Sequence, residues 1–520
     1  MPTLPLLALV CTFAVGILLF WGVTIDDAFI VFRLAENAKL GHGFVWNPGG
    51  QPVEGMTSIL WTTMLCPFAG EKGLAYTWAK VLGMLALVGA LAVFLRLARS
   101  ILDPTTFRSA IWILVPICPL LTFHAMNGLE TSMAVLGVLG MLFCSFQVMR
   151  TNREPNRNIV SAAAAYGASW LMGGMVRPEL VLYGLLLGAF VFSGLDRTQR
   201  YRFLGAVCLT FLGPGLAYFL ARWWYFGLPL PLSFYVKHAP GMYSLYGAKY
   251  VALSLAGLTG GLVLLGFLGG RGAFRTTIPV DRVRLLFWPS LLLCVSYVSF
   301  VPIMGFVYRF TVPFALPLIL VASGTIVGTV RDRRTSPARA IAATTASLAV
   351  FQLASSVVPA YHFVTVNSAA TQVFHVRFGE LLAGISSEGR LAAFNEIGGP
   401  SFFSGWHSVE GAGVVTPHVA RHHELSQEEI VRDFDPDVII MTVDEHGLER
   451  RGAFPGFRLI RKVPWLVYGG GGPRHYQAVF AREDWADLSK LERGVEDLGL
   501  GEIDPPWYCP LYRVAKHLFA

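Results

Sequence analysis

The chain has 520 residues, of which 54% are hydrophobic and only 14% are charged, and its formal net charge is +8. Soluble chains carry about 25% charged residues, so this composition excludes an ordinary soluble protein. The cations lie in short loops between apolar runs and form no basic face with interleaved aromatics, which excludes nucleic acid as a partner.

Apolar runs long enough to cross a bilayer recur along residues 1–359. The first run lacks a positively charged start and a small-residue cleavage site, so we expect a retained helix and no removed signal peptide. We predict about eleven transmembrane helices, at residues 4–22, 74–95, 109–123, 131–149, 159–176, 178–193, 203–224, 250–270, 285–303, 310–330 and 340–359.

Arginines are unevenly divided between the two sets of alternate loops. One set of five loops holds seventeen arginines, whereas the opposite loops up to residue 310 hold seven cations in a longer total length. The positive-inside rule places the arginine-rich loops in the cytoplasm. With an odd number of spans, residues 360–520 are then outside, and we expect a multi-pass protein of the inner (plasma) membrane.

Residues 360–520 differ in character from the rest of the chain. Short β-type runs alternate here with helical stretches, and Ser426 followed by Glu429 predicts a capping box. The predicted fold class is a polytopic α-helical membrane protein with a C-terminal extracytoplasmic α/β domain. Residues 1–359 form the transmembrane domain and residues 360–520 the α/β domain.

The first outer loop, residues 23–73, carries a carboxylate pair, Asp26-Asp27, directly after the first span. One of the two could cap the helix that follows, because Asp is a favoured N-cap residue. Capping does not account for both. Paired carboxylates at a membrane boundary are costly to bury and are usually functional. The pair therefore predicts an active site.

Later turns on the same side of the membrane carry further polar residues. Each taken alone has an ordinary interpretation as a helix cap, a loop break or a snorkelling cation. Together they predict charged groups that converge at the outer leaflet. These residues are Glu130, then Arg177 and Glu179, then Tyr235, Lys237 and His238, and finally Arg309.

The first-loop segment DDAFIVFRLAENAKLGHGFVWNPGGQPVEGMTS resembles the first loop of the GT-C glycosyltransferases, polytopic enzymes that use polyprenyl-phosphate sugars. More narrowly, it is similar to that of the actinobacterial terminal β-(1→2)-arabinofuranosyltransferase family. The segments NGLET, RPE, FGLPLPLSFYVKH, YRF and NEIGGPSFFSG resemble later motifs of that family in the same order. The chain departs from it in the turn at residues 229–233 and in a shorter tail, which leaves the sugar and the acceptor open.

The resemblance implies an inverting transfer of a sugar, arabinofuranose being one candidate, from a polyprenyl-phosphate donor to a cell-envelope glycan or glycolipid. Asp26 and Asp27 are then the catalytic pair, with Asp26 favoured as the base. Ion pairs that merely join helices explain Glu130 and Glu179 equally well. The expected donor-phosphate ligands are Lys237, His238, Arg309 and Arg177, and the expected sugar or acceptor ligands are Glu54, Glu130, Glu179 and Tyr235.

No resident cofactor or metal is expected, although a divalent-metal requirement stays open. His418 and His422 have a helical metal-ligand spacing, but the sequence supplies no third ligand beside them. The expected partners are membrane lipids, the lipid-linked donor and the acceptor. Two other functions are a transporter or flippase of lipid-linked sugars and a non-catalytic scaffold with an outer binding domain. Charged residues at helix ends, and not at the bilayer midplane, favour an enzyme.

Overall fold

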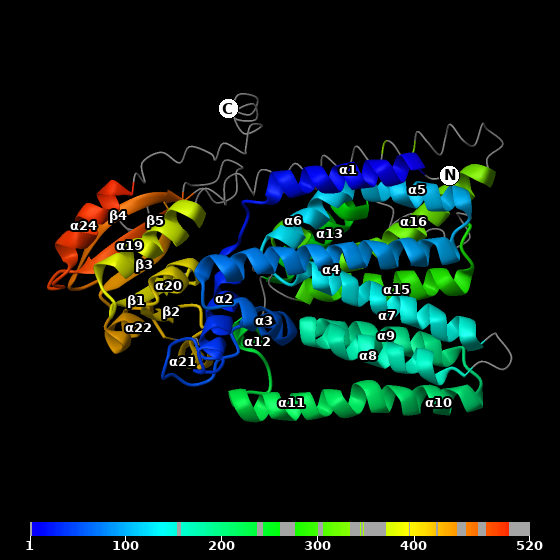
Figure 1. The fold of residues 1–520 in the computed structure, drawn as a ribbon, viewed down its shortest axis with the longest axis horizontal. Coiled ribbons are helices and arrows are strands. Elements are labelled where there is room, and N and C mark those ends of the chain that lie inside the picture. Colours follow the sequence, from blue (N-terminus) through cyan, green and yellow to red (C-terminus); the bar gives the residue numbers. More distant parts are fainter. Residues whose placement is uncertain are drawn as a thin grey trace.

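A long helical bundle and a smaller α/β unit lie end to end in the computed structural model (Figure 1). The structure describes residues 3–152, 158–236, 243–259, 276–299, 305–332, 344, 347, 371–394, 396–422, 425–444, 454–465 and 475–498.

Helices that run along the bundle account for most of residues 3–332. They are α1 (Thr3–Phe20), α4 (Lys72–Ile101), α5 (Pro104–Leu114), α6 (Cys118–Met126), α7 (Thr131–Asn152), α8 (Val160–Val176), α9 (Glu179–Ser193), α10 (Arg197–Val207), α11 (Gly213–Phe226), α13 (Tyr243–Thr259), α15 (Val280–Ser296) and α16 (Val312–Asp332). Among the described residues, six helical stretches are long and apolar enough to cross a membrane. The chain is thus a multi-pass membrane protein.

A helix occupies each predicted span as far as residue 330, although α13 covers only the first part of the span at 250–270. The last predicted span, 340–359, lies outside the described residues apart from positions 344 and 347. The total of eleven helices therefore stays a prediction.

Burial separates central helices from peripheral ones. The apolar window of Val312–Arg331 is 94% buried, whereas that of Arg197–Phe226 is only 17% buried. Both windows have a mean hydropathy of 1.8, and an apolar helix surface that does not contact protein must face lipid. The α16 helix is therefore enclosed by other parts of the protein. The α10 and α11 helices lie at the edge of the bundle (Figure 1).

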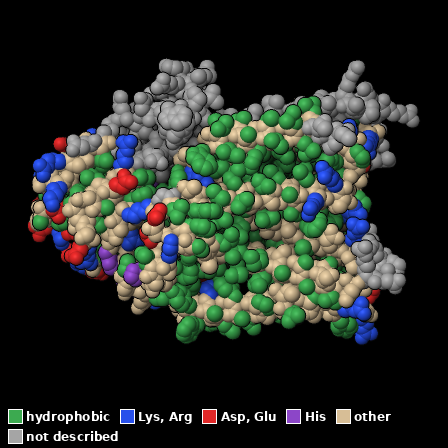
Figure 2. Space-filling view, in the orientation of Figure 1, with side chains coloured by type: hydrophobic (Ala, Val, Ile, Leu, Met, Phe, Trp, Pro, Cys, Tyr) green, Lys and Arg blue, Asp and Glu red, His purple; other side chains and the backbone are tan. Residues whose placement is uncertain are grey.

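Helix ends that flank the arginine-rich loops lie at the end of the bundle away from the α/β unit. Figure 1 places the last residues of α4, α7 and α16 and the first residues of α10 at that end, and Figure 2 shows Lys and Arg side chains gathered there. The first outer loop lies at the opposite end, beside the α/β unit. The described ends of these helices therefore lie on one side of the bundle, as the alternation of the loops predicts.

Three short helices cover the bundle end that faces the α/β unit: α2 (Asp26–Lys39), α3 (Ile59–Leu65) and α12 (Leu232–Val236). The α2 helix begins at Asp26, and its N-cap residue is Ile25. Neither Asp therefore caps this helix, and the alternative of a capping role is excluded. Both carboxylates instead occupy the first turn, where the positive end of the helix dipole favours negative charge.

The α/β unit contains a five-stranded mixed sheet in the order β2-β1-β3-β5-β4. The β1 strand pairs in parallel with β2 and with β3, while β5 is antiparallel to β3 and β4. The strands are β1 (Arg390–Phe394), β2 (His407–Glu410), β3 (Val438–Asp444), β4 (Phe457–Trp465) and β5 (His475–Arg482). The helices are α19 (Phe378–Ile385), α20 (Gly398–Ser404), α21 (Pro417–Arg421), α22 (Gln427–Phe434) and α24 (Leu488–Asp497).

The carboxyl end of β1 lies at a switch point of the sheet, because the strands that follow in the chain, β2 and β3, lie on opposite sides of β1. Such a point is where open α/β sheets characteristically bind ligands. The loop after β1 contains Glu396 and leads into Gly398 and Gly399. The capping box of Ser426 and Glu429 at the start of α22 is confirmed.

The first outer loop and the α/β unit share one hydrophobic core. Phe29 and Phe32 of α2 lie 5.8 and 6.0 Å from the ring of Phe402. The buried guanidinium of Arg33 donates hydrogen bonds to the carbonyls of Ser401, Trp406 and Trp46. These contacts hold α2, and with it the carboxylate pair, between the bundle and the sheet.

Candidate active site

The two carboxylates at the start of α2 face different surroundings. Asp26 is enclosed, with a side chain only 6% exposed, and its two oxygens accept hydrogen bonds from the backbone N–H groups of Gly398 (2.9 Å) and Gly399 (2.7 Å). Nδ1 of His375 lies 3.1 Å from Asp26 Oδ1. The Asp27 side chain is 28% exposed. Asp26 therefore anchors the α/β unit, while Asp27 is the more accessible carboxylate.

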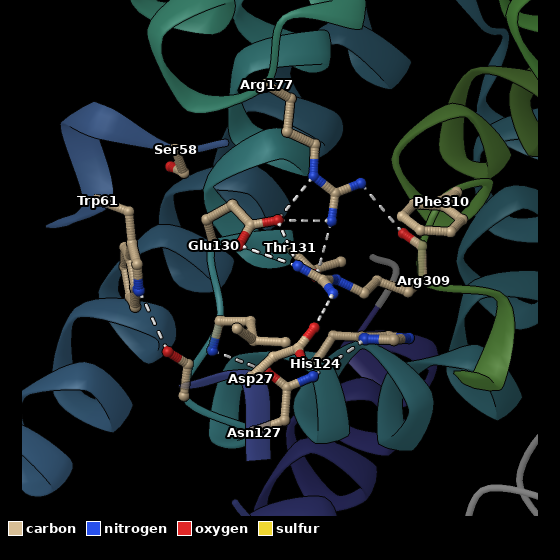
Figure 3. A network of polar contacts seen from close by, with 12 residues as sticks. Asp27, Ser58, Trp61, His124, Asn127, Glu130, Thr131, Arg177, Arg309 and Phe310 are labelled. Atoms are coloured by element: carbon tan, nitrogen blue, oxygen red, sulfur yellow. Dashed lines mark hydrogen bonds and ion pairs between the residues drawn. The ribbon is translucent and has the colours of Figure 1, made fainter. Parts of the chain in front are cut away.

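Asp27 belongs to a network that joins four bundle segments (Figure 3). Its Oδ2 lies 3.7 Å from a terminal nitrogen of Arg309. The other terminal nitrogen of Arg309 donates to both oxygens of Glu130, at 3.0 and 3.2 Å. Arg177 contacts the same Glu130 at 2.9 Å through Nε and through one terminal nitrogen. One buried carboxylate thus holds two arginines.

The negative charge of Glu130 and the positive charges of its two arginine partners stabilise each other in this buried network. Burial alone would raise the pKa of Glu130, but the guanidinium groups of Arg309 and Arg177 lower it to about 2. Arg177 also donates to Thr131 Oγ1 and to the backbone carbonyl of Arg309. All three of its nitrogens are therefore engaged, and its effect is to position Arg309.

The turn that carries Arg309 has an unusual backbone. Val307 and Tyr308 have φ angles of 49° and 62°, in the left-handed region that β-branched and bulky side chains rarely adopt. The carbonyl of Val307 lies 2.9 Å from Nε2 of the buried His124. Strain of this kind persists only where surrounding contacts enforce it, and it concentrates at functional sites.

Two glutamates from the α/β unit, the half-buried Glu396 and the buried Glu410, extend the acidic cluster. Burial, followed by the charges of Asp26 and Asp27, raises the pKa of Glu396 well above its ordinary value. Burial also raises the pKa of Glu410 to about 8, assisted by Asp27 and Asp26 and opposed by backbone hydrogen bonds such as that from Val415 (3.1 Å). Burial of His375 lowers the pKa of its imidazole. The cluster therefore holds more carboxyl groups than can all be charged together.

Glu54 lies apart from this network. It forms a two-point ion pair with Arg222 of α11, at 2.7 and 2.5 Å. Glu54 also lines a shallow groove between the first loop, the segment after α11 and α21, whose lining includes Leu230 and Arg421. Both oxygens of Glu54 are occupied, so its contact with Arg222 is first a link between the loop and the bundle.

The structure brings together part of the set predicted from the sequence. Asp26, Asp27, Glu130, Arg177 and Arg309 converge, and Glu179 joins their edge through Arg177 (3.9 Å) and the hydroxyl of Tyr297 (2.9 Å). Tyr235 is half-buried on α12. Lys237 and His238 lie outside the described residues.

Three residues that the sequence analysis did not single out are part of this region: His375, Glu396 and Glu410. A fourth, Arg222, is the partner of Glu54 outside it. Glu396 stands within NEIGGPSFFSG, so the motif offered a signal for it. His375 stands alone in the sequence among apolar neighbours and offered none. Its role depends on a fold that places Gly399 against it.

Replacing Gly398 with Ala should separate the α/β unit from α2. An added Cβ would lie 2.2 Å from the carbonyl oxygen of Asp26, so the backbone must move. The hydrogen bonds to Asp26 would lengthen, and we expect a lower thermal midpoint and reduced activity. The control is Gly384→Ala in α19, where nothing lies within 4 Å of the added Cβ. Equal midpoints for the two variants would contradict this packing.

The raised pKa of Glu410 should appear as a pH dependence of stability. Its folded-state pKa of about 8 exceeds the ordinary 4.5, so its stabilising contribution is complete below about pH 4.5 and is lost as the pH rises to about 8. The loss is at most about 1.4 kcal/mol per pH unit within this window.

Thermal unfolding at pH 5 and pH 8 would measure this effect. Glu410→Gln should flatten the decline between the two pH values, whereas Glu388→Gln, at an exposed position, should not. Parallel pH profiles for the wild type and Glu410→Gln would exclude the predicted ionisation.

Comparisons with known proteins identify the fold. No family model and no curated protein sequence matches the chain. Among solved structures, ArnT from Cupriavidus metallidurans bound to undecaprenyl phosphate is 11% identical, with a TM-score of 0.58 over 94% of this chain and 98% of that one. The oligosaccharyltransferase AglB from Archaeoglobus fulgidus, in complex with an inhibitory peptide and a dolichol-phosphate, is 9% identical, with a TM-score of 0.50 over 86% and 70%.

A mycobacterial arabinofuranosyltransferase, AftD, is 14% identical over 92% of this chain and 42% of its own, with a TM-score of 0.43. At that TM-score the overlap carries no argument about the sugar. The likeness to ArnT and AglB covers both the bundle and the α/β unit, and the chain has the GT-C fold of those membrane glycosyltransferases.

Proposed function

We propose that this chain is an inverting glycosyltransferase that moves a sugar from a polyprenyl-phosphate donor to a hydroxyl of a cell-envelope glycan or glycolipid. The reaction takes place at the outer face of the membrane. The observation that carries this proposal is the pairing of an accessible carboxylate, Asp27, with a cation 3.7 Å away, Arg309, at the end of an apolar bundle. A lipid-linked substrate would meet both groups there.

The transfer needs a base and an anion site close together. The acceptor hydroxyl attacks the anomeric carbon of the donor sugar, and a new C–O bond forms while the bond from that carbon to the phosphate oxygen breaks. The electron pair of the broken bond leaves with polyprenyl phosphate. The proton of the acceptor hydroxyl passes to a carboxylate, which returns it to water after the product departs. Inversion follows from a single displacement.

Asp27 suits the role of the base better than Asp26. The oxygens of Asp26 already accept hydrogen bonds from Gly398 and Gly399, and an acceptor would have to displace these contacts. The Asp27 side chain is more exposed, at 28% against 6% for Asp26. The sequence analysis favoured Asp26 because of its position in the motif; the difference in exposure between the two side chains supports the second Asp instead.

Arg309 is the proposed phosphate ligand. Among the described residues its Nε has no hydrogen-bond partner, and one terminal nitrogen is only loosely paired with Asp27. The remaining N–H donors of this guanidinium can form charge-assisted hydrogen bonds with a phosphate, whose developing charge is best stabilised in a site shielded from water. Lys237 and His238 remain proposed ligands of the same phosphate, and Arg177 acts through Arg309.

The proposal also covers the residues that contact the sugar or the acceptor, the identity of the sugar and the side of the membrane on which the α/β unit lies. Glu54, Glu130, Glu179 and Tyr235 stay candidates for sugar or acceptor contacts, but the ion pairs of Glu54 and Glu130 favour a positioning role. The resemblance of the first loop makes arabinofuranose a sugar to be tested. The arginine distribution supports an extracytoplasmic α/β unit in an inner-membrane protein.

A transporter or flippase of lipid-linked sugars and a non-catalytic scaffold are the other candidates. Purified protein in liposomes should be given fluorescent polyprenyl-phosphate sugars and a glycan acceptor, with release of polyprenyl phosphate and movement between leaflets followed together. Release that depends on the acceptor supports the transferase. Movement without release supports a flippase, and neither event supports a scaffold.

A further inference from the structure

Three separate segments bring metal-ligating groups to one point beside the proposed active site. Asp26 comes from the first turn of α2, His375 from the helical segment Thr371–Arg377, and Glu396 from the loop after β1. One ligand atom from each residue lies within 4.8 Å of the other two. Among the described residues, no other group of three such side chains converges in this way.

The separations are close to those of a bound ion. Nδ1 of His375 lies 3.1 Å from Asp26 Oδ1, and its Nε2 lies 3.9 Å from Glu396 Oε2. Metal bonds of about 2.0–2.2 Å to nitrogen and oxygen place two ligands on one ion at most about 4.4 Å apart. The imidazole can give only one of its two nitrogens to a single ion. Because one ligand atom from each of the three residues lies within 4.8 Å of the others, side-chain shifts of about 0.5 Å would bring all three within bonding distance of one ion.

The local charge also favours a cation. Asp27 and Glu410 interact electrostatically with Glu396, in addition to Asp26, so four carboxyl groups share this region. The adjacent cation, Arg309, is already paired with Glu130. Asp26 and His375 are buried, while the Glu396 side chain is 22% exposed, which leaves one side for entry and for water ligands.

We propose that Asp26, His375 and Glu396 bind one divalent transition-metal ion, of the class of Mn²⁺ or Zn²⁺. One imidazole and two carboxylates form a mixed nitrogen and oxygen set, which suits these ions better than Mg²⁺ or Ca²⁺, for which all-oxygen sites are typical. The ion ties the first turn of α2 to the loop after β1. It thereby fixes the position of Asp27, which is not itself a ligand.

The close packing of the two glycines agrees with a site that needs this geometry. A Cβ on Gly399 would lie 2.2 Å from Cβ of His375, and one on Gly398 would lie 3.0 Å from a carboxylate oxygen of Asp26. Only glycine at these two positions lets the loop after β1 approach both ligands. The metal site goes beyond the transfer reaction and does not depend on it.

Binding should be tested on full-length protein in detergent, freed of metal with a chelator and then titrated with MnCl₂. The free Mn²⁺ signal in electron paramagnetic resonance gives the stoichiometry and the affinity without donor or acceptor. We expect one tight site per chain, weakened more than about 10-fold in His375→Ala and in Glu396→Gln, since loss of a group that only orients a ligand already has an effect of that size.

His418→Ala is the matched control, because His418 lies outside the proposed site and forms a pair with His422, with ring centroids 4.8 Å apart. It should bind Mn²⁺ as the wild type does. Because His375→Ala removes a buried side chain, its thermal midpoint in chelator is compared with that of the wild type. Glu396→Gln keeps the shape of the side chain and gives a second test if that variant unfolds.

Absence of stoichiometric Mn²⁺ binding would overturn the proposal, as would binding that survives both substitutions. In the first case the Asp26, His375 and Glu396 cluster is only a hydrogen-bonded proton relay. Because binding is measured without substrates, tight binding together with failed transfer would count against the proposed function alone. Transfer by protein that binds no Mn²⁺ would count against the metal site alone.

Discussion

Asp27→Asn is expected to lower kcat for glycosyl transfer by about 10²–10⁴-fold, which is the range for loss of a positioned general base. The amide cannot accept the proton of the acceptor hydroxyl, yet it occupies the same volume. KM for the donor should change little, because the phosphate is held by other groups. Initial rates across donor concentrations, with the purified variant, measure both quantities.

The variant Asp26→Asn distinguishes the role of Asp26 from that of Asp27. An amide offers one oxygen, so the N–H of either Gly398 or Gly399 would face an NH₂ group and lose its partner, at a cost of about 1–3 kcal/mol. We expect a lower thermal midpoint for Asp26→Asn and a nearly native one for Asp27→Asn. Full activity in Asp27→Asn, with loss of activity in a natively stable Asp26→Asn, would return the base to Asp26.

Glu130→Gln is expected to destabilise the bundle by about 3–5 kcal/mol, because it leaves the buried guanidinium groups of Arg177 and Arg309 without their shared countercharge. Donor turnover should fall as well, since Arg309 loses the contact that orients it. Thermal unfolding in detergent and the initial transfer rate would report the two effects.

Glu179→Gln is the matched control for this change. Glu179 is 27% exposed and lies 3.9 Å from Arg177, so its replacement should cost no more than about 1 kcal/mol. If both variants unfold at the same temperature, Glu130 does not hold the network together. If Glu130→Gln retains full turnover, its contact with Arg309 is not needed for the donor.

Much of the bundle could be predicted because lipid imposes a simple rule: a backbone in hydrocarbon must satisfy its own hydrogen bonds, and apolar runs therefore become helices. The arginines in alternate loops then predicted which ends of the helices lie on the same side of the membrane. The α/β unit was predicted from local patterns, including the capping box at Ser426. Its sheet order could not be predicted, because β1 pairs with β3 across more than forty residues of chain.

The site was partly predictable for the same reason. Asp26, Asp27, Glu130, Arg177 and Arg309 stand at helix ends that the topology places on one side, so their convergence followed from the loop assignment. The different surroundings of Asp26 and Asp27 could not be predicted from the loop assignment. They arise from the loop after β1, which packs Gly398 against α2. His375 and Glu410 reach the site only through long-range packing of the α/β unit.

The stereochemistry of the product tests the central proposal most directly. Purified protein in lipid nanodiscs should be given a series of polyprenyl-phosphate pentoses and hexoses of known anomeric configuration, with an acceptor glycan. Nuclear magnetic resonance then follows the anomeric proton of the product together with the released polyprenyl phosphate. We predict one inverted glycosidic bond for each phosphate released, with both signals lost in Asp27→Asn. A product that retains the donor configuration, or phosphate release that Asp27→Asn leaves unchanged, would contradict the proposed mechanism.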